Sequence, residues 1–312
     1  MMVSAVTNPE TIITLDSITT MQEMNHQVCE NTLATNAADL PAGSRQIVTP
    51  GHEPSKQLRD TRDNKWYWVS KLADQNCWMV QNLALDITEA GLSAKDTDIT
   101  MDWNSASAYP PVNTRKGKFD LNGVNTTNNL AAGESTNSWN LGEYVIKNPT
   151  VIAERCLLTN GNTMDVCPNQ VQPYDGSQDE HYLVGNYYQW NTATAGTGRS
   201  TAINASTSSS ICPKNWQLPE KNMDKSFDSL ANVYRITTSE PMTLPPLYFT
   251  RSGKVYLNGK NLSGIGADGY AATNSYASTE RKMVNLFLFE KELATQGEDW
   301  SVDGKNVRCV AR

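Results

Sequence analysis

The chain ends in a mostly apolar segment that contains a cysteine, Asn306–Arg312. Chain ends usually fray unless other parts of the protein hold them. In an extended strand Val307, Cys309 and Ala311 would share one face, and the two residues between them would share the other. The pattern therefore predicts a core strand anchored by a disulfide, in a secreted domain whose first and last parts meet.

The six cysteines indicate disulfide bonds more than metal binding or redox chemistry. None belongs to a CxxC pair, and the three histidines show no zinc-ligand spacing. Six cysteines allow fifteen pairings, and six buried thiols in a reducing cytosol remain the alternative. Because Cys156 and Cys167 bracket a short polar loop, a local bond is favoured there. The preferred set is Cys29–Cys77, Cys156–Cys167 and Cys212–Cys309.

Composition indicates an extracellular type of surface, with a loop-rich intracellular domain as the alternative. Of the 312 residues 38% are hydrophobic and 19% charged, and the polar surplus is mostly Asn, Thr, Ser and Gln. The net charge of −7, without a basic cluster, disfavours nucleic-acid binding. No run of 18 apolar residues predicts a membrane span. Met1–Val6 lack the pattern of a signal peptide, so a signal or anchor has either been removed or does not exist.

The N-terminal part reads as an extension that precedes the main domain. Residues 1–18 look extended, and a short helix is predicted to begin in Thr19–Met24, with Thr20 and Glu23 as a capping box. Residues 33–58 are rich in Ala, Pro, Gly and Ser and read as a linker or long loop. The ordered domain is expected to begin near Leu58.

The main domain reads as strands, one longer helix and long loops. Residues 86–150 look like insertions with only short elements. A helix is predicted over Glu220–Tyr234 and a loop over Asn258–Ser278. The predicted strands are Trp66–Leu72, Asn76–Leu83, Tyr248–Val255 and Met283–Phe289, with Tyr182–Trp190 read as a strand or a tight aromatic turn. Five tryptophans of these segments are expected in the core: Trp66, Trp68, Trp78, Trp190 and Trp216.

Five segments together resemble the Fibrobacter succinogenes major paralogous (FISUMP) domain. The resemblance covers residues 58–312, in the family's order. The leader Met21–Met24 followed by Cys29 is similar to versions of the family from ultrasmall bacteria and archaea. The segments that carry the resemblance are Arg59–Lys65, Leu72–Leu83, Gly185–Trp190, Cys212–Pro219 and Asn306–Val310.

The resemblance implies an α+β fold of the C-type-lectin-like, or formylglycine-generating-enzyme-like, kind. Such a fold has short helices, small antiparallel sheets and long loops. It would place residues 58–312 in one ligand-binding domain and residues 1–57 in an extension that is packed on it or linked to it. It also implies a secreted or cell-surface protein, akin to the variable proteins of diversity-generating retroelements.

The chain departs from the family where diversified lectin folds place their variable residues. The family's Trp-Ser-Ser-Thr after a late Gly-Tyr is replaced within Gly269–Ser278, and Gln217 stands where related enzymes favour Arg. The replaced stretch is rich in the residues that diversified codons favour, which also fill ordinary surface loops. We expect a variable, exposed ligand-binding face within 250–300, made by Tyr270, Ala272, Asn274, Ser275, Tyr276, Ser278 and Glu280.

Ligand binding or adhesion is therefore the predicted function, and the partner is an unknown protein or glycan at a cell surface. No catalytic motif stands out, so we expect no enzyme. The alternatives are an oxidase like the formylglycine-generating enzymes, which would need a reactive cysteine pair, and a structural cell-surface protein.

No cofactor is expected, and a structural cation such as calcium is left open without assigned ligands. Asp120–Asn125 alternates oxygen side chains around a glycine but lacks the closing glutamate of a calcium loop. Glu298-Asp299 is the nearest acidic pair and reads as a solvated turn.

Overall fold

The computed structural model contains a mixed α+β protein, built mostly of strands with a few short helices. The described residues are 17–33, 35–36, 55–86, 114–118, 135–141, 143–149, 156–157, 163–164, 170–195, 210–221, 224–256, 261–278, 282–289 and 292–312.

The N-terminal part forms a 3-10 turn, η2 (Met21–Glu23), and then the helix α1 (His26–Thr32). The predicted capping interaction is present, because the Thr20 backbone N–H donates to the Glu23 carboxylate at 2.9 Å. The turn ends at Met24, whose backbone is extended. A new N-cap follows at Asn25, whose side chain accepts from the Val28 N–H at 2.9 Å. The predicted single helix is therefore two elements.

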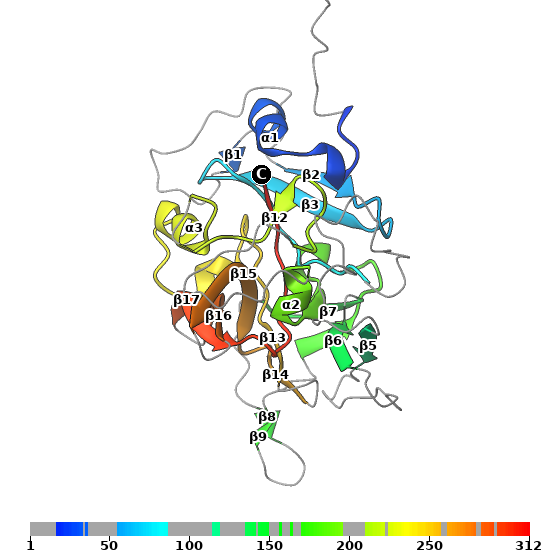
Figure 1. Ribbon diagram of the computed structural model, residues 1–312, viewed down its shortest axis with the longest axis vertical. Coiled ribbons are helices and arrows are strands. Elements are labelled where there is room, and N and C mark those ends of the chain that lie inside the picture. Colours follow the sequence, from blue (N-terminus) through cyan, green and yellow to red (C-terminus); the bar gives the residue numbers. More distant parts are fainter. Residues whose placement is uncertain are drawn as a thin grey trace, which may run out of the picture.

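A six-stranded sheet lies beneath α1 (Figure 1). The predicted strand Trp66–Leu72 is confirmed as β3. The predicted strand Asn76–Leu83 is shorter and ends at Met79. Beyond Met79 the Trp68 N–H donates to the Gln81 side chain at 2.7 Å, in place of a backbone carbonyl of a neighbouring strand. The other strands of this sheet are β1 (Thr35–Asn36), β2 (Ser55–Arg59), β4 (Cys77–Met79), β12 (Trp216–Gln217) and β18 (Val310–Ala311).

The C-terminus is a core strand of this sheet, as predicted. β18 lies between β4 and β12, and Val310 is opposite Trp78 on one side and Gln217 on the other. The predicted two faces are also present. Val307, Cys309 and Ala311 belong to one hydrophobic cluster and Val310 to a second. The first and last parts of the chain meet, because the His26 N–H donates to the Arg312 carbonyl at 2.6 Å.

Two of the three predicted disulfides are confirmed, Cys29–Cys77 and Cys212–Cys309. The first attaches α1 to β4, and the second attaches the segment before β12 to the segment before β18. The described residues contain no free cysteine. The predicted Cys156–Cys167 bond is not tested, because Cys167 lies outside the described residues.

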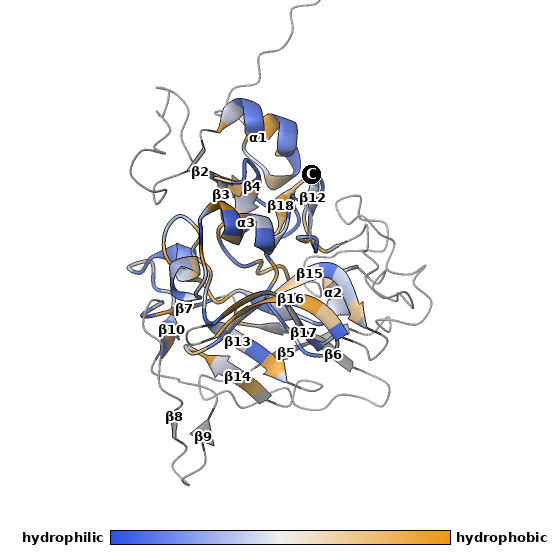
Figure 2. Ribbon diagram, turned by 90° about the vertical axis from the view of Figure 1, so that its left-hand side faces the viewer, coloured by the Kyte–Doolittle hydropathy of each residue, from blue (hydrophilic) through white to orange (hydrophobic). Residues whose placement is uncertain are grey.

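A second, five-stranded sheet curls beneath the first, in the order β14-β13-β15-β16-β17 (Figure 2). The predicted loop over Asn258–Ser278 is wrong, since it contains β14 and the long β15. The segment is extended because its small side chains fit between packed elements on both faces, as Ala271 and Ala272 show by belonging to different clusters. The strands are β13 (Ser252–Tyr256), β14 (Asn261–Ile265), β15 (Gly269–Ser278), β16 (Lys282–Leu288) and β17 (Leu293–Trp300).

The helix α3 (Phe227–Val233) lies between the two sheets in both views (Figures 1 and 2). It is shorter than predicted, because Ser226 caps it by accepting the Ser229 N–H at 3.0 Å. Phe227 and Leu230 pack in one cluster with residues of β4 and β16. A 3-10 turn, η5 (Glu240–Thr243), follows it.

Some of the remaining described elements contribute to a third cluster, which includes Trp139, Tyr187 and Val255. The strands among them form a three-stranded sheet and two two-stranded sheets. No helix within the described ranges combines the length and apolar character needed to cross a bilayer. These elements are β5 (Thr114–Lys118), β6 (Ser135–Asn140), β7 (Tyr144–Ile146), β8 (Cys156–Leu157), β9 (Thr163–Met164), β10 (Val171–Pro173), η4 (Glu180–Tyr182), β11 (Asn186–Tyr188) and α2 (Trp190–Ala193).

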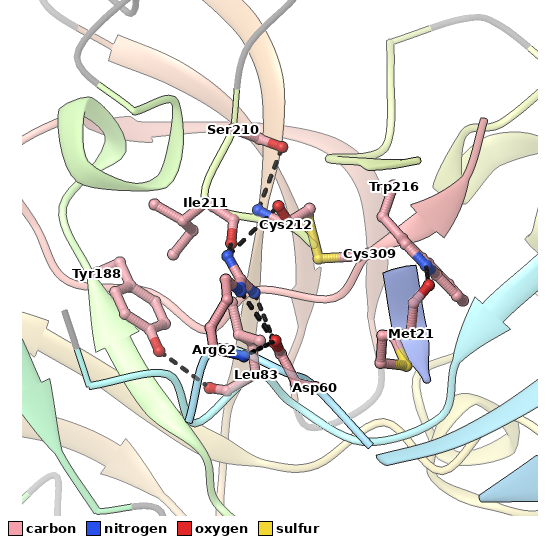
Figure 3. Close-up of a disulfide and its surroundings, with 10 residues drawn as sticks. All are labelled: Met21, Asp60, Arg62, Leu83, Tyr188, Ser210, Ile211, Cys212, Trp216 and Cys309. Carbon is pink, nitrogen blue, oxygen red and sulfur yellow. Dashed lines mark hydrogen bonds and ion pairs between the residues drawn. A yellow bond between two sulfur atoms is a disulfide. The ribbon is translucent and has the colours of Figure 1, made fainter. Parts of the chain in front are cut away.

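A buried ion pair lies next to the Cys212–Cys309 bond (Figure 3). Arg62 Nη2 donates to Asp60 Oδ2 at 2.6 Å, and both side chains are fully buried. Arg62 Nη1 also donates to the Ile211 carbonyl at 2.7 Å. Burial alone would raise the pKa of Asp60, but Arg62 outweighs it and holds that pKa below its ordinary value. The pair joins the β2–β3 turn to the disulfide.

We expect the Cys212→Ala/Cys309→Ala double variant to lose stability. The bond spans 97 residues, and in the chain-entropy model closing a loop of that length is worth about 4.7 kcal/mol. Urea unfolding of the two proteins measures the difference, and an unchanged midpoint would contradict the assignment. Thiol titration of the unfolded, unreduced wild type should find at most two thiols, because four of the six cysteines are bonded.

We expect Asp60→Asn to destabilise the protein by about 3 to 5 kcal/mol, because it leaves Arg62 buried without a counter-charge. Because the pKa of Asp60 is lower in the folded state, the ion pair contributes its full stability above the pKa that Asp60 has in the unfolded chain. That stability is lost as the pH falls through the pKa of Asp60 in the folded protein. The stability gap between wild type and variant should therefore narrow in acid. The exposed Glu292→Gln is the control and should change stability by less than about 0.5 kcal/mol.

Candidate ligand-binding face

The predicted face divides between buried residues and a half-buried tyrosine. Ala272, Asn274, Ser275 and Tyr276 are buried, and even the large Tyr276 is only 8% exposed. Tyr270 is half-buried. Ser278 is the last residue of β15, and Glu280 lies outside the described residues.

The expectation of exposure is therefore wrong for those four side chains, and packing against α2 explains why. The Tyr276 ring lies 5.4 Å from the Trp190 ring, and Trp190 Nε1 donates to the Thr273 carbonyl at 2.9 Å. On another side the Lys221 N–H donates to Ser275 Oγ at 3.1 Å. A stretch that resembles a polar loop is thus a part of the core, which uses its hydroxyls internally.

An exposed tyrosine lies on the neighbouring strand β13. Lys254 and Tyr256 share one face of β13 because they are two residues apart, and Tyr256 is 40% exposed. Lys254 Nζ lies 4.7 Å from the centre of the Tyr256 ring and 5.1 Å from that of Tyr270. The Lys254 cation therefore contacts one ring from β13 and one from β15.

The half-buried Phe289 extends this aromatic surface, and the buried Phe287 supports it. The rings of Tyr270, Phe287 and Phe289 meet edge to face, with centres 5.2 to 6.0 Å apart. Gly297 of β17 lies against Phe287, and a side chain at that position would collide with the ring. We call this surface the aromatic face, defined by Tyr256, Tyr270, Phe287 and Phe289.

Charged groups next to the aromatic face neutralise one another. Lys254 Nζ lies 2.7 Å from Asp299 Oδ2 and 3.2 Å from Asp303 Oδ2, and Lys305 Nζ lies 3.4 Å from Asp299 Oδ2. Burial lowers the pKa of Lys305 to about 8, although Asp299 opposes the effect. Burial would raise the pKa of Asp299, but Lys305 and Lys254 outweigh it and lower the value. Two cations and two carboxylates leave the cluster without net charge.

The reading of Glu298-Asp299 as a solvated turn is wrong for Asp299, which lies in β17 and is nearly buried. Within the described residues, no group of histidine, cysteine and carboxylate side chains is arranged to hold a metal ion. The other calcium candidate, Asp120–Asn125, lies outside them. The aromatic face can therefore bind through ring surfaces and one exposed tyrosine hydroxyl.

Sequence reasoning missed Lys254, Tyr256 and the two phenylalanines as parts of a surface. The predicted strand ended at Val255, one residue before the exposed tyrosine. A signal was present, because Lys254 and Tyr256 flank the apolar Val255 in an alternating pattern. The contact of Asp299 with Lys254 depends on the curl of the sheet, which no local sequence pattern predicts.

A second aromatic group lies near the edge of the six-stranded sheet. His181 stacks between Trp68 and Tyr248, with ring centres 5.2 and 4.3 Å away. Trp66, two residues from Trp68, is 51% exposed. Core burial is thus confirmed for Trp78, Trp190 and Trp216, but it is wrong for Trp66, and Trp68 is only half-buried.

Comparisons of this chain with protein-family models, with curated proteins and with solved structures find no match. The interpretation of the aromatic face accordingly rests on its own geometry and on the segments quoted from the sequence.

Two tyrosines of the same sheet provide a matched test of this geometry. Tyr276→Ala should cost about 3 kcal/mol of unfolding free energy, because it opens a cavity against Trp190. Tyr256→Ala should cost less than about 1 kcal/mol, because its ring is largely exposed. Denaturant unfolding of both variants measures the costs, and equal costs would contradict the assigned burial.

Proposed function

We propose that this chain is an extracellular ligand-binding or adhesion protein with a C-type-lectin-like scaffold, and that it binds through the aromatic face. The single observation that carries the proposal is the exposed Tyr256, which shares its contact with Lys254 with the half-buried Tyr270 on the curled sheet. Tyrosines of this kind supply large contact areas at low cost in conformational entropy.

The architecture supports a rigid scaffold of that kind. Short helices and a curled, mainly antiparallel sheet accompany a first sheet in which the C-terminal strand is central. Two disulfides connect distant parts of the chain, and stable disulfides are typical of secreted and cell-surface proteins. A scaffold held in this way pays little ordering cost when it binds.

The chemistry of the face favours an uncharged or weakly charged ligand. The neighbouring lysines and aspartates are already paired, so they offer no strong net charge for a partner to neutralise. Ring surfaces suit either the apolar face of a sugar or an aliphatic side chain. The proposed partner is accordingly a glycan or a protein surface outside the cell.

Sequence diversification belongs to the same proposal, but at positions other than the buried residues 272–276. Tyr256 is largely exposed and Tyr270 is half-buried, whereas residues 272–276 are buried and tolerate change less well. A reverse-transcriptase gene and a template repeat near the coding sequence would support it. Variation among sibling copies should then fall at Tyr256 and Tyr270, and variation confined to 272–276 would contradict it.

An oxidase like the formylglycine-generating enzymes is less well supported. Such an enzyme needs a reactive cysteine pair, and four of the six cysteines are engaged in the two disulfides. Only Cys156 and Cys167 could supply it.

The test is binding of the full chain to an array of immobilised glycans and purified cell-surface proteins. We expect at least one specific binder, whose affinity falls roughly thirtyfold in Tyr256→Ala, the loss of a hot-spot tyrosine worth about 2 kcal/mol. Trp66→Ala is the matched control, since it removes an aromatic ring that is at least as exposed from another sheet. Equal losses in the two variants, or no binder on the array, would count against the aromatic face.

A further inference from the structure

Lys254 and two aspartates form an arrangement in which the amine and a carboxyl group could react with each other. Lys254 Nζ lies within hydrogen-bond distance of both Asp299, at 2.7 Å, and Asp303, at 3.2 Å. The three residues come from β13, from β17 and from the turn that follows β17. They are therefore brought together by the tertiary fold, and not by neighbourhood in the sequence.

We propose that Lys254 Nζ and Asp299 Cγ join spontaneously in an intramolecular amide bond, with Asp303 as the proton carrier. This inference goes beyond ligand binding and does not depend on it.

The reacting side chains are largely shielded from solvent. The Lys254 and Asp299 side chains are nearly buried, and Asp303 is completely buried. The Tyr256 and Tyr270 rings cover Lys254 at 4.7 and 5.1 Å. Holding an amine against a carboxyl group in one orientation replaces a bimolecular encounter by a unimolecular step.

The bond change is balanced without any co-reactant. The Lys254 ammonium gives a proton to the carboxylates, which leaves an amine and a carboxylic acid. The amine attacks Asp299 Cγ, and Asp303 takes the second proton from the nitrogen. Asp303 then returns that proton to the departing hydroxyl of Asp299, so that a new C–N bond forms, a C–O bond breaks and one water leaves.

The surrounding charges support the attack on Asp299 but oppose the proton transfer that precedes it. A poorly solvated site favours a neutral amine and a neutral acid over separated ions. Lys305 Nζ, 3.4 Å from Asp299 Oδ2, is placed to stabilise the negative charge that develops on that oxygen. Burial favours the neutral form of Lys254, but Asp299 and Asp303 outweigh it and raise the pKa of Lys254, so proton transfer to a carboxylate has to come first.

The bond would connect strands that are not neighbours in the sheet. β13 and β17 are separated by β15 and β16 in the strand order, and the curl of the sheet brings Lys254 to Asp299. β17 is an edge strand, which is the part of a sheet most prone to detach or to pair with other chains. An amide at this position would hold that edge covalently.

The test is the intact mass of the full chain after it has been kept folded at neutral pH, then unfolded, reduced and alkylated. We expect a mass lower by one water than the sequence requires. Proteolysis and fragmentation should identify one branched peptide that joins Lys254 to Asp299. A full sequence mass would overturn the proposal.

Two other sources of a one-water loss are separated by the same fragmentation. Imide formation at Asp303-Gly304 leaves Lys254 in an unmodified peptide, and a bond from Lys305 to Asp299 leaves Lys254 free. Either result would overturn the assignment to Lys254. Because this readout uses the wild-type protein, it does not depend on the folding of a variant.

Variants supply the second readout. Lys254→Met should restore the full sequence mass, as should Asp303→Asn, which keeps the shape of the side chain but cannot carry the proton. Lys282→Met is the matched control, because Lys282 lies over the Trp300 ring at 5.9 Å in the same sheet, and it should keep the one-water loss. Persistence of that loss in Lys254→Met would overturn the proposal.

Discussion

The burial of the C-terminal segment is the constraint on which the other parts of this structure depend. Arg308 has no exposed surface, and its guanidinium donates to Asn82 Oδ1 at 3.0 Å and to the carbonyls of Leu247 and Tyr248. A buried guanidinium without acceptors would be strongly destabilising, so the 247–248 backbone and Asn82 must be positioned around it. Val310 completes the first sheet, and Cys309 holds the segment before β12. The six-stranded sheet, the loop that leads into β13 and the start of β12 are thus positioned by one short piece of chain.

Patterns that depend on local alternation and capping could be predicted from the sequence. The Val307–Ala311 alternation predicted two faces, and the structure places those faces in two different hydrophobic clusters. The strand Trp66–Leu72 was predicted because its apolar pattern is a local signal. The two disulfides were predicted because an even number of cysteines is a compositional signal. Helix ends were less predictable, because one capping side chain, at Asn25 or Ser226, decides where each helix begins.

The candidate site was predicted only to the level of its region, 250–300. Residues 272–276 look like a surface loop, because small and hydroxylated side chains are common there. The same side chains also suit a strand packed on both faces, where Ala271 and Ala272 leave room for neighbouring elements and Thr273 Oγ1 donates to the Val284 carbonyl at 2.7 Å. The packing of Trp190 against one side of this segment decides between a surface loop and a buried strand. The partnership of Lys254 with Asp299 is equally dependent on sheet curvature, which is a property of the whole fold.

The position of β18 also bears on the order in which the protein can be made. β3 and β4 leave the ribosome early, and Cys29 can find Cys77 after 48 residues of synthesis. The strand β18 is made much later, because Cys309 follows Cys212 by 97 residues. Until it emerges, β4 lacks its neighbour on that side of the sheet, and Cys212 lacks its disulfide partner. A chain of this design therefore needs oxidising surroundings late in its folding as well as early.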